Sequence, residues 1–273
     1  MKIDGHTIAA EIIEKLKKLP KPEKIFAAIL IGDDPRSISF LKQKEQVAKE
    51  MGINFRLYKL EAELGNDGLR QEIRRLVEKK SVGGAIVQLP LPEGINPPYV
   101  LNAVPREKDI DVLGERALGA FYNGRNPVLP PAVATVKAVL DKIVFNLEKA
   151  EVAVVGLGAL VGKPVGTWLT GKCKDLFLLR EGSDLELLKR VDLIVTGVGQ
   201  AGLIKQDMLK PGTGIIDFGY YYFPDGEVSG DFSPDPSTSS GQVSFYTPTP
   251  GGTGPILVAE LFHNFFILSS HKK

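Results

Sequence analysis

The chain has 273 residues, of which 43% are hydrophobic and 25% are charged, and its 34 Lys and Arg residues balance 33 Asp and Glu residues. This composition is typical of a globular protein, and the length allows one large or two ordinary domains. The near-zero net charge gives no reason to expect a nucleic-acid partner or an anionic membrane surface.

Two further features bear on location and on metals. No apolar run approaches the ~20 residues that a membrane span needs, and the polar first residues do not resemble a signal peptide. The single cysteine, Cys173, excludes an intramolecular disulfide and a structural zinc cluster. We therefore expect a cytoplasmic protein with no metal site and no membrane contact.

The first half of the chain alternates predicted helices and strands. Apolar residues at helical spacing mark the helices, and short buried or alternating runs mark the strands. Ser37 is expected to cap the second helix, which Gly52 ends. The predicted helices are 8–19, 37–51 and 67–79, and the predicted strands are 24–31, 54–59 and 84–87.

A stiff loop follows the strand at 84–87. Its sequence is Gln88-Leu89-Pro90-Leu91-Pro92, and its two prolines cannot donate ladder hydrogen bonds. A polar Gln at the end of a buried strand is well placed to contact a ligand. The alternative, in which Gln88 only satisfies loop backbone, has at least equal weight on this evidence alone.

Two acidic residues, Asp109 and Asp111, lie two positions apart in the segment 105–113. If this segment is extended, both carboxylates point to the same side. Such a pair is more often a solvated face than a functional site, so both interpretations remain open here.

The proline-rich stretch 126–132 reads as a joint between two domains, and a helix is expected over 135–146. A buried strand at 152–155 then runs into Gly156-Leu157-Gly158 and Gly162, followed by a helix at 164–170. A strand, a glycine turn and a helix N-terminus together face an anion. The spacing G-x-G-x-x-x-G is one residue longer than the dinucleotide fingerprint, which makes it a weak signal alone.

Three more strands strengthen the case for a nucleotide. They are expected at 175–179, 191–196 and 214–218, with helical patterns between them and glycines after the last two, including Gly197 and Gly199. Repeated βα units predict a parallel sheet with a ligand at its carboxyl edge. Arg180 and Glu181 end the strand whose tip reads the ribose in such folds. A structural layer without a ligand is the alternative. A Ser- and Pro-rich loop at 234–241 and a final helix at 256–268 complete the chain.

Several short motifs occur together in a specific order. They are Ser37, Phe40 and Lys44 on one helix, QLPLP at 88–92, KDID at 108–111, VGKP at 161–164, KPG at 210–212, DFG at 217–219, GDF at 230–232 and PGGTGP at 250–255. In this order the chain resembles the methylenetetrahydrofolate dehydrogenase/cyclohydrolase family, the bifunctional folate enzymes.

The resemblance implies two α/β domains with the active site in a cleft between them. Residues 1–129 would form a folate-side catalytic domain, and the final helix, 256–273, would pack back on it. Residues 130–255 would form a Rossmann-like NAD(P)-binding domain, through which a homodimer forms. The implied reaction oxidises 5,10-methylenetetrahydrofolate with a nicotinamide cofactor and hydrolyses the methenyl product to 10-formyltetrahydrofolate.

The resemblance also implies roles for residues at matching positions. Lys44 would be the acid/base group, because burial and a cationic substrate favour a neutral lysine. Gln88 would orient it, and Asp111 would hold the pterin N–H donors, whereas Asp109 would be structural. The expected folate contacts are Ser37, Phe40, Leu89, Pro90, Pro250, Gly251 and Gly252. The expected cofactor contacts are Gly156, Leu157, Gly158, Gly162, Arg180, Glu181, Gly197 and Gly199.

The chain departs from the family pattern at informative positions. Phe40 replaces a tyrosine one helical turn before Lys44, which puts the cyclohydrolase rate in doubt. Leu157-Gly158 replaces an Arg-Ser pair that grips the 2′-phosphate of NADP. Arg180 can restore that grip, whereas Glu181 favours the ribose diol of NAD. NADP is expected, with NAD possible. No glycine follows Asp111.

Three rival functions remain open, and the departures motivate the first of them. One is a family member with only one activity, and another is a shikimate dehydrogenase-like oxidoreductase. The third is a binding protein without turnover.

Overall fold

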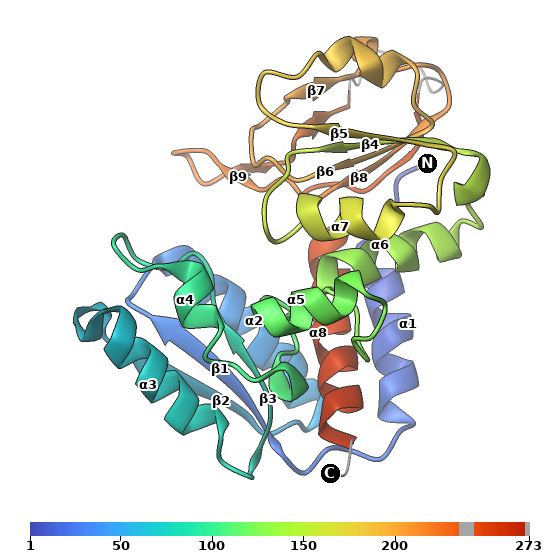
Figure 1. Cartoon of the computed structure of the whole chain (residues 1–273). Helices are drawn as coiled ribbons and strands as arrows, with labels where there is room; N and C mark the ends of the chain where they lie inside the picture. Colours follow the sequence, from blue (N-terminus) through green and yellow to red (C-terminus); the bar gives the residue numbers. More distant parts are fainter. Residues whose placement is uncertain (235–242, 271–273) are drawn as a thin grey trace. The chain divides into compact units, whose positions relative to one another are not determined.

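The computed structural model describes residues 1–234 and 243–270, which form two units, each built on its own parallel sheet (Figure 1). The three-stranded unit comprises Glu11–Pro131 and Val258–Lys273, and the five-stranded unit comprises Met1–Ala10 and Ala132–Leu257. The predicted two-domain α/β fold class is therefore confirmed. The loop predicted at 234–241 lies, apart from Pro234, outside the described residues.

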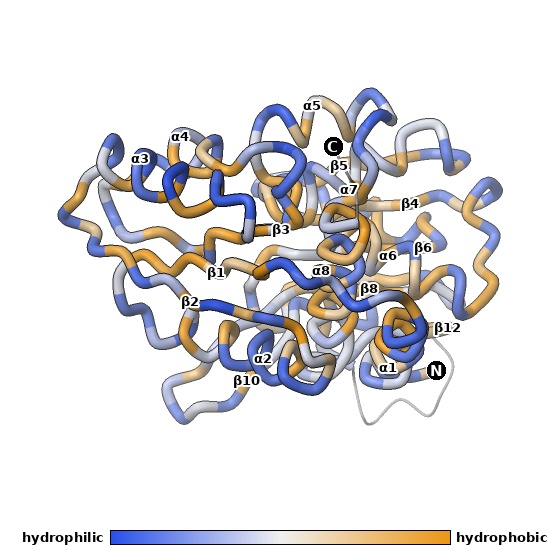
Figure 2. The backbone as a smooth tube through the Cα atoms, turned by 90° about the horizontal axis from the view of Figure 1, so that it is seen from below, coloured by the Kyte–Doolittle hydropathy of each residue, from blue (hydrophilic) through white to orange (hydrophobic). Residues whose placement is uncertain are grey.

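The sheet of the three-stranded unit has the order β2-β1-β3, with all strands parallel. Every residue of β1 (Ile25–Ile31) and β3 (Val82–Val87) is buried, whereas β2 (Phe55–Leu60) alternates in exposure. The tube of β1 is hydrophobic along its length in Figure 2. Unbroken apolar runs of this kind belong to parallel strands covered on both faces. The three predicted strands are confirmed, with ends displaced by one or two residues.

Four α-helices connect these strands or follow them. They are α2 (Pro35–Met51), α3 (Gly65–Val77), α4 (Pro97–Leu101) and α5 (Glu115–Tyr122). The expectation that Ser37 caps α2 is wrong. The cap is Asp34, whose carboxylate accepts the Ser37 N–H at 2.8 Å. Pro35 can open the helix because its fixed φ and missing N–H suit the first turn, and Ser37 therefore lies buried inside the helix.

The long helix α8 (Thr253–Ser270) ends in the three-stranded unit and packs on β1 there. The rings of Phe262 and Phe265 each lie 5.2 Å from the ring of Phe26. A Cβ atom at Gly84 of β3 would lie 2.6 Å from Ile110 and 3.0 Å from Phe265. Glycine at position 84 therefore lets the segment around Ile110 approach the sheet closely.

The five-stranded sheet has the order β12-β8-β6-β4-β5, and its paired strands are parallel. Its strands are β4 (Glu151–Val155), β5 (Asp175–Leu179), β6 (Leu193–Thr196), β8 (Thr213–Asp217) and β12 (Val243–Tyr246). After β4 the chain forms β5 on one side of β4 and then crosses over to form β6 on its other side. The strand order thus reverses at the carboxyl end of β4, where open α/β sheets bind ligands.

Smaller elements complete this unit. Helix α7 (Gly162–Leu169) follows β4, and α6 (Pro131–Lys142) precedes it. The first residues of the chain also belong here, because the Ile3 N–H donates to the Tyr246 carbonyl at 2.8 Å before α1 (Gly5–Lys17) begins. A hairpin of β9 (Tyr221–Tyr222) and β10 (Val228–Ser229) extends from the sheet in Figure 1, and β7 (Ile204–Lys205) pairs with β11 (Phe232–Ser233). Within the described ranges, no helix is long and apolar enough to span a bilayer.

Candidate active site

Lys44 lies in the middle of α2 and is only 8% exposed. Its Nζ donates to Oε1 of Gln88 at 2.9 Å, directly after β3. The Gln88 side chain is itself oriented, because its Nε2 donates to the Leu89 carbonyl at 2.6 Å. The strand end and the proline loop therefore hold the amide that faces the lysine. Gln88 therefore binds loop backbone, as one of the two interpretations from sequence expected, and it also contacts Lys44.

Burial and charge together shift the pKa values of Lys44 and Asp111. Burial lowers the pKa of the Lys44 amine, and the nearby Asp111 carboxylate partly opposes this. Burial raises the pKa of Asp111 to about 6, with the charge of Lys44 acting in the opposite direction. At neutral pH the pair thus combines an ionised carboxylate with a lysine that gives up its proton more readily than an exposed one. Such an amine can act as a base and, once protonated, as an acid.

Asp109 and Asp111 do not lie in an extended segment, so the condition on which both carboxylates would point to the same side is not met. The segment is not a continuous strand, because Arg106–Lys108 forms a 3₁₀ turn and Val112 adopts a φ of 56°. Asp109 is 4% exposed, and its Oδ2 accepts the N–H groups of Leu113 at 3.0 Å and Gly114 at 2.8 Å. Burial raises the pKa of Asp109 to about 7, even though these amides favour its charged form.

The other predicted folate contacts divide between the two units. Ser37, Phe40, Leu89 and Pro90 lie in the three-stranded unit with Lys44. Ser37 is buried and its Oγ lies 3.5 Å from the Leu89 carbonyl, whereas Phe40 is half-buried one turn before Lys44.

Pro250, Gly251 and Gly252 lie in the five-stranded unit. There the Gly5 N–H donates to the Gly251 carbonyl at 3.0 Å, and a Cβ on Gly252 would lie 2.4 Å from the Pro248 carbonyl oxygen. Glycine at position 252 therefore allows the tight fold of this loop against the start of α1.

The glycine turn after β4 is built as the sequence predicts. Gly156 has a φ of 84°, and its N–H donates to the Leu179 carbonyl of β5 at 2.9 Å. A Cβ on Gly162 would lie 1.8 Å from the Gly156 carbonyl oxygen, whereas a Cβ on Gly158 would meet nothing within 4 Å. The turn therefore closes tightly onto the N-terminus of α7 and leaves open space at Gly158. This geometry suits the pyrophosphate of a dinucleotide.

The remaining predicted cofactor residues lie at neighbouring strand ends. Arg180 and Glu181 are exposed directly after β5, where a turn is closed by the Arg180 N–H donating to Ser183 Oγ at 3.0 Å. Gly197 and Gly199 follow β6, and a Cβ on Gly156 would lie 3.2 Å from the Gly197 carbonyl oxygen. The structure therefore brings these glycine segments together at the carboxyl edge of the five-stranded sheet.

Two buried acids support this edge and were assigned no role from sequence. Asp231 is fully buried and accepts four hydrogen bonds of 2.7–2.9 Å, from the Thr196 hydroxyl and from the N–H groups of Val198, Gly199 and Gln200. Asp217, at the end of β8, accepts the N–H groups of Gly219 at 2.6 Å and Phe232 at 2.9 Å. Their motifs, DFG and GDF, were the available signal, but only the fold shows what the carboxylates contact.

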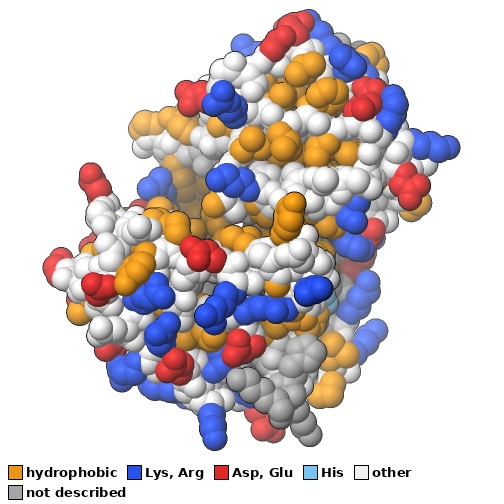
Figure 3. All heavy atoms as spheres, in the orientation of Figure 1, with side chains coloured by type: hydrophobic (Ala, Val, Ile, Leu, Met, Phe, Trp, Pro, Cys, Tyr) orange, Lys and Arg blue, Asp and Glu red, His pale blue; other side chains and the backbone are white. Residues whose placement is uncertain are grey.

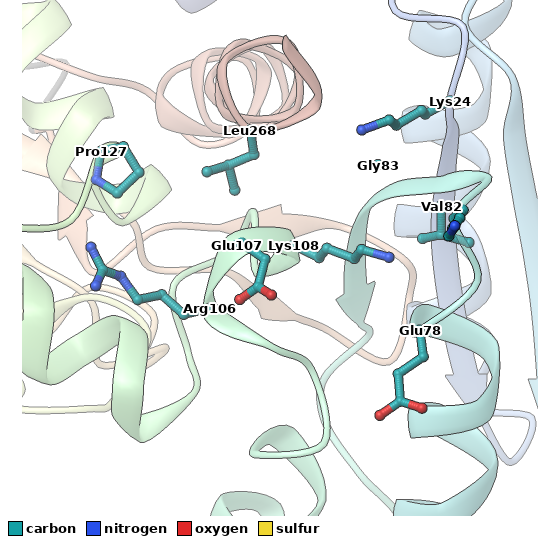
Figure 4. A pocket seen from close by; sticks show the side chains of 10 residues that line it. Lys24, Glu78, Val82, Gly83, Arg106, Glu107, Lys108, Pro127 and Leu268 are labelled. Atoms are coloured by element: carbon teal, nitrogen blue, oxygen red, sulfur yellow. The ribbon is translucent and has the colours of Figure 1, made fainter. Parts of the chain in front are cut away.

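A separate cavity of about 710 Å³ lies in the three-stranded unit (Figure 4). Its walls include Lys24, Val82 and Lys108, which places it at the amino ends of β1 and β3. Lys44 and Gln88 meet at the carboxyl end of β3 and do not line it. The Lys108 amine is occupied by the carbonyls of Val77 at 2.6 Å and Lys79 at 3.0 Å. The cavity is therefore distinct from the candidate active site.

Comparison with known families matches both parts of the chain. Residues 3–111 match the catalytic domain of tetrahydrofolate dehydrogenase/cyclohydrolase, and residues 130–273 match the NAD(P)-binding domain of the same family. These matches support the folate enzymes over the shikimate dehydrogenase-like alternative.

Individual relatives agree over nearly the full length. The bifunctional protein FolD of Bacillus pumilus is 35% identical over 96% of this chain and 95% of its own, and that of Bacillus subtilis is 33% identical over 96% and 95%. The crystal structure of the bifunctional methylenetetrahydrofolate dehydrogenase/cyclohydrolase from Campylobacter jejuni shares 30% identity and a TM-score of 0.91, with 98% of each chain covered. The Trypanosoma brucei enzyme, solved with NADP and an inhibitor, shares 26% identity and a TM-score of 0.89 over 98% of this chain and 97% of its own.

Proposed function

Because the chain belongs to the tetrahydrofolate dehydrogenase/cyclohydrolase family, we propose that it carries out both reactions of that family. It oxidises 5,10-methylenetetrahydrofolate to the 5,10-methenyl compound and hydrolyses the latter to 10-formyltetrahydrofolate. The observation that carries the proposal is the buried Lys44, which is hydrogen-bonded to Gln88. Burial lowers the pKa of its amine, and the Asp111 carboxylate partly opposes this shift. An amine of this kind is suited to proton transfer at neutral pH.

Three residues of the three-stranded unit have separate roles in this function. Asp111 is ionised at neutral pH and accepts the amino and ring N–H donors of the pterin, which fixes the folate. Gln88 keeps the Lys44 amine in one orientation. In the hydrolysis, neutral Lys44 accepts a proton from the water that adds to the methenyl carbon. It then returns that proton to the ring nitrogen as the bond from this nitrogen to the carbon breaks. The hydroxyl group of the adduct loses its proton to solvent, and the formyl C=O bond forms.

The five-stranded unit supplies the residues for the cofactor, for which we propose NADP. When bound there, a nicotinamide dinucleotide would supply the hydride acceptor for the methylene carbon. The glycine turn from Gly156 to Gly162 suits its pyrophosphate, and Gly197 and Gly199 border the same sheet edge. Arg180 is exposed at the strand end that reads the ribose, where a guanidinium can bind the 2′-phosphate. The complexed T. brucei enzyme supports this choice.

We also propose a cytoplasmic homodimer formed through the five-stranded unit. Four consecutive aromatic residues, Tyr220 to Phe223, are each 36–41% exposed on and beside the β9 strand. Figure 3 shows hydrophobic side chains on this hairpin. Exposed apolar side chains gathered on one element are typical of protein interfaces.

The direct test of the activity follows absorbance of the purified protein with methylenetetrahydrofolate, in parallel with NADP and with NAD. We expect the reduced cofactor to accumulate faster with NADP, and the methenyl product then to decay. Hydrolysis without reduction would instead indicate an enzyme with cyclohydrolase activity alone, and reduction without hydrolysis would indicate the converse loss, which Phe40 makes a specific alternative. Binding without either reaction would contradict the proposal.

The role of Lys44 is tested by Lys44→Met. Because general acid–base catalysis contributes about 10²–10⁴-fold, we expect the cyclohydrolase turnover to fall by about 100-fold or more, as measured by decay of methenyltetrahydrofolate. Lys42→Met, on the exposed face of the same helix, is the matched control and is expected to retain full turnover. Undiminished hydrolysis by Lys44→Met would exclude this lysine as the acid/base group.

A further inference from the structure

Val112, the residue after Asp111, has a φ of 56°. This left-handed conformation is unfavourable for a β-branched residue. Val112 is also fully buried, at 0% exposure. Such a conformation persists only where its surroundings enforce it.

The Asp109 carboxylate is hydrogen-bonded to the backbone on the C-terminal side of Val112. Its Oδ2 accepts both the Leu113 N–H at 3.0 Å and the Gly114 N–H at 2.8 Å, so it bridges the two residues that follow Val112. The Val112 N–H lies 3.4 Å from the Asp109 carbonyl, which closes the turn from the other side.

The start of this turn is anchored to neighbouring elements. Asp109 forms a parallel bridge with Ala85 of β3, and the Ile110 carbonyl accepts from Nδ2 of the buried Asn264 at 2.9 Å. Asp111 therefore lies between two anchored residues, Asp109 and Ile110, and the strained Val112. The direction of its side chain depends on the backbone that these contacts hold.

We propose that Asp109 is a positioning residue, whose carboxylate holds Val112 in the left-handed conformation and thereby fixes Asp111 beside Lys44. The inference deepens the proposed function, because it concerns the carboxylate assigned to the pterin. It also gives a reason for burying Asp109, whose own side chain contacts its turn rather than Lys44.

The chain contains a matched control for the strain. Val144, after α6, has a φ of 55° but is 88% exposed and lies in the other unit. Val144→Gly therefore relieves the same backbone conformation without touching the candidate site. It is expected to raise the urea midpoint and to leave the KM for methylenetetrahydrofolate unchanged.

The test is a double-mutant cycle between Asp109→Ala and Val112→Gly. Misplacement of a binding group by about 1 Å costs up to about 100-fold, so Asp109→Ala is expected to raise the KM for methylenetetrahydrofolate by about tenfold or more, with kcat changed far less. Asp109→Asn keeps one acceptor oxygen and is expected to raise KM less. Because glycine adopts the left-handed conformation without strain, the effects of Asp109→Ala on the urea midpoint and, on a logarithmic scale, on KM are expected to be at least halved in the Val112→Gly background. Comparison within that background also cancels the loss of the buried Val112 side chain.

Additive effects in the cycle would overturn the proposal, as would an Asp109→Ala variant with a lower urea midpoint and an unchanged KM. If Asp109→Ala does not fold, the same cycle with Asp109→Asn decides between these outcomes. A wild-type protein without turnover would refute the proposed function and with it the positioning of Asp111 for folate. The double-mutant cycle measured by urea unfolding needs no folate, so it would still show separately whether Asp109 holds Val112 in the left-handed conformation.

Discussion

The chemistry of the candidate site depends on one buried amine. Lys44 follows two exposed residues of α2, yet it is buried and its pKa is lowered, because the helix turns this position toward the Gln88 loop. Lys42, two positions earlier, is exposed on the same helix. Residue type alone therefore does not distinguish them, and burial and the neighbouring amide decide which one can be a base.

Arg180 is the residue on which the proposed cofactor preference depends. Arg180→Ala is expected to weaken NADP binding by about tenfold or more and to leave NAD binding nearly unchanged, because a hydrogen bond to a charged group contributes about 1.5–3 kcal/mol. Titration calorimetry with each dinucleotide measures both affinities. Lys172→Ala, in the turn before the amino end of β5, is the control. Equal losses for NAD and NADP would contradict a phosphate contact and favour the alternative in which Glu181 binds the ribose diol.

At the scale of elements, the functional segments sit at the carboxyl ends of parallel strands. Gln88 follows β3, the glycine turn follows β4, Arg180 follows β5 and Gly197 follows β6. Since parallel strands end at one edge of their sheet, segments distant in the sequence become neighbours there. The carboxylate of Asp231 then fixes the loop after β6 through three backbone amides.

The proposed dimer depends on the β9–β10 hairpin. The double variant Tyr221→Ser/Phe223→Ser is expected to shift the protein from dimer to monomer, because it removes exposed aromatic area whose burial favours association. Light scattering coupled to size-exclusion chromatography should give a mass near 29.7 kDa for the variant and twice that for the wild type. Val144→Ser, which also removes an exposed apolar side chain, should remain dimeric. A wild-type monomer would contradict the proposal.

At the scale of the whole molecule, buried carboxylates link stability to pH. Burial raises the pKa of Asp217 well above that of an ordinary aspartate, to about 7, with the neighbouring Asp231 acting in the same direction. Between about pH 5 and 7 the folded protein therefore keeps a proton that the unfolded chain has lost. This contribution to the free energy of unfolding falls as pH rises, by up to about 1.4 kcal/mol per pH unit.

Asp217→Asn isolates that contribution. Relative to the wild type, its free energy of unfolding should decline less steeply between pH 5 and 7, because the titrating proton is absent. Urea unfolding at pH 5, 6 and 7 gives the two slopes. Asp225→Asn, an exposed residue, should keep the wild-type slope. Identical slopes in Asp217→Asn and the wild type would mean that Asp217 is ionised throughout this range.

Much of the fold could be predicted from local patterns. The runs at 24–31 and 152–155 correspond to β1 and β4, and the G-x-G-x-x-x-G spacing corresponds to the turn before α7. Periodicity and glycine spacing encode these features within a few residues. Ser37 was wrongly predicted as the cap of α2, because Asp34 and Pro35 also suit a helix start. Spacing alone does not show which of these residues begins the helix.

By itself, the sequence determined the order of βα units, the family and the segments that carry the candidate site, because these depend on residue type and spacing along the chain. Only the tertiary structure decided that Asp109 accepts the Gly114 N–H and that Asp231 binds the loop after β6, whereas the Lys44–Gln88 hydrogen bond was already implied by the family resemblance. Burial and hydrogen bonds between residues far apart in the chain arise from packing. No local pattern contains them.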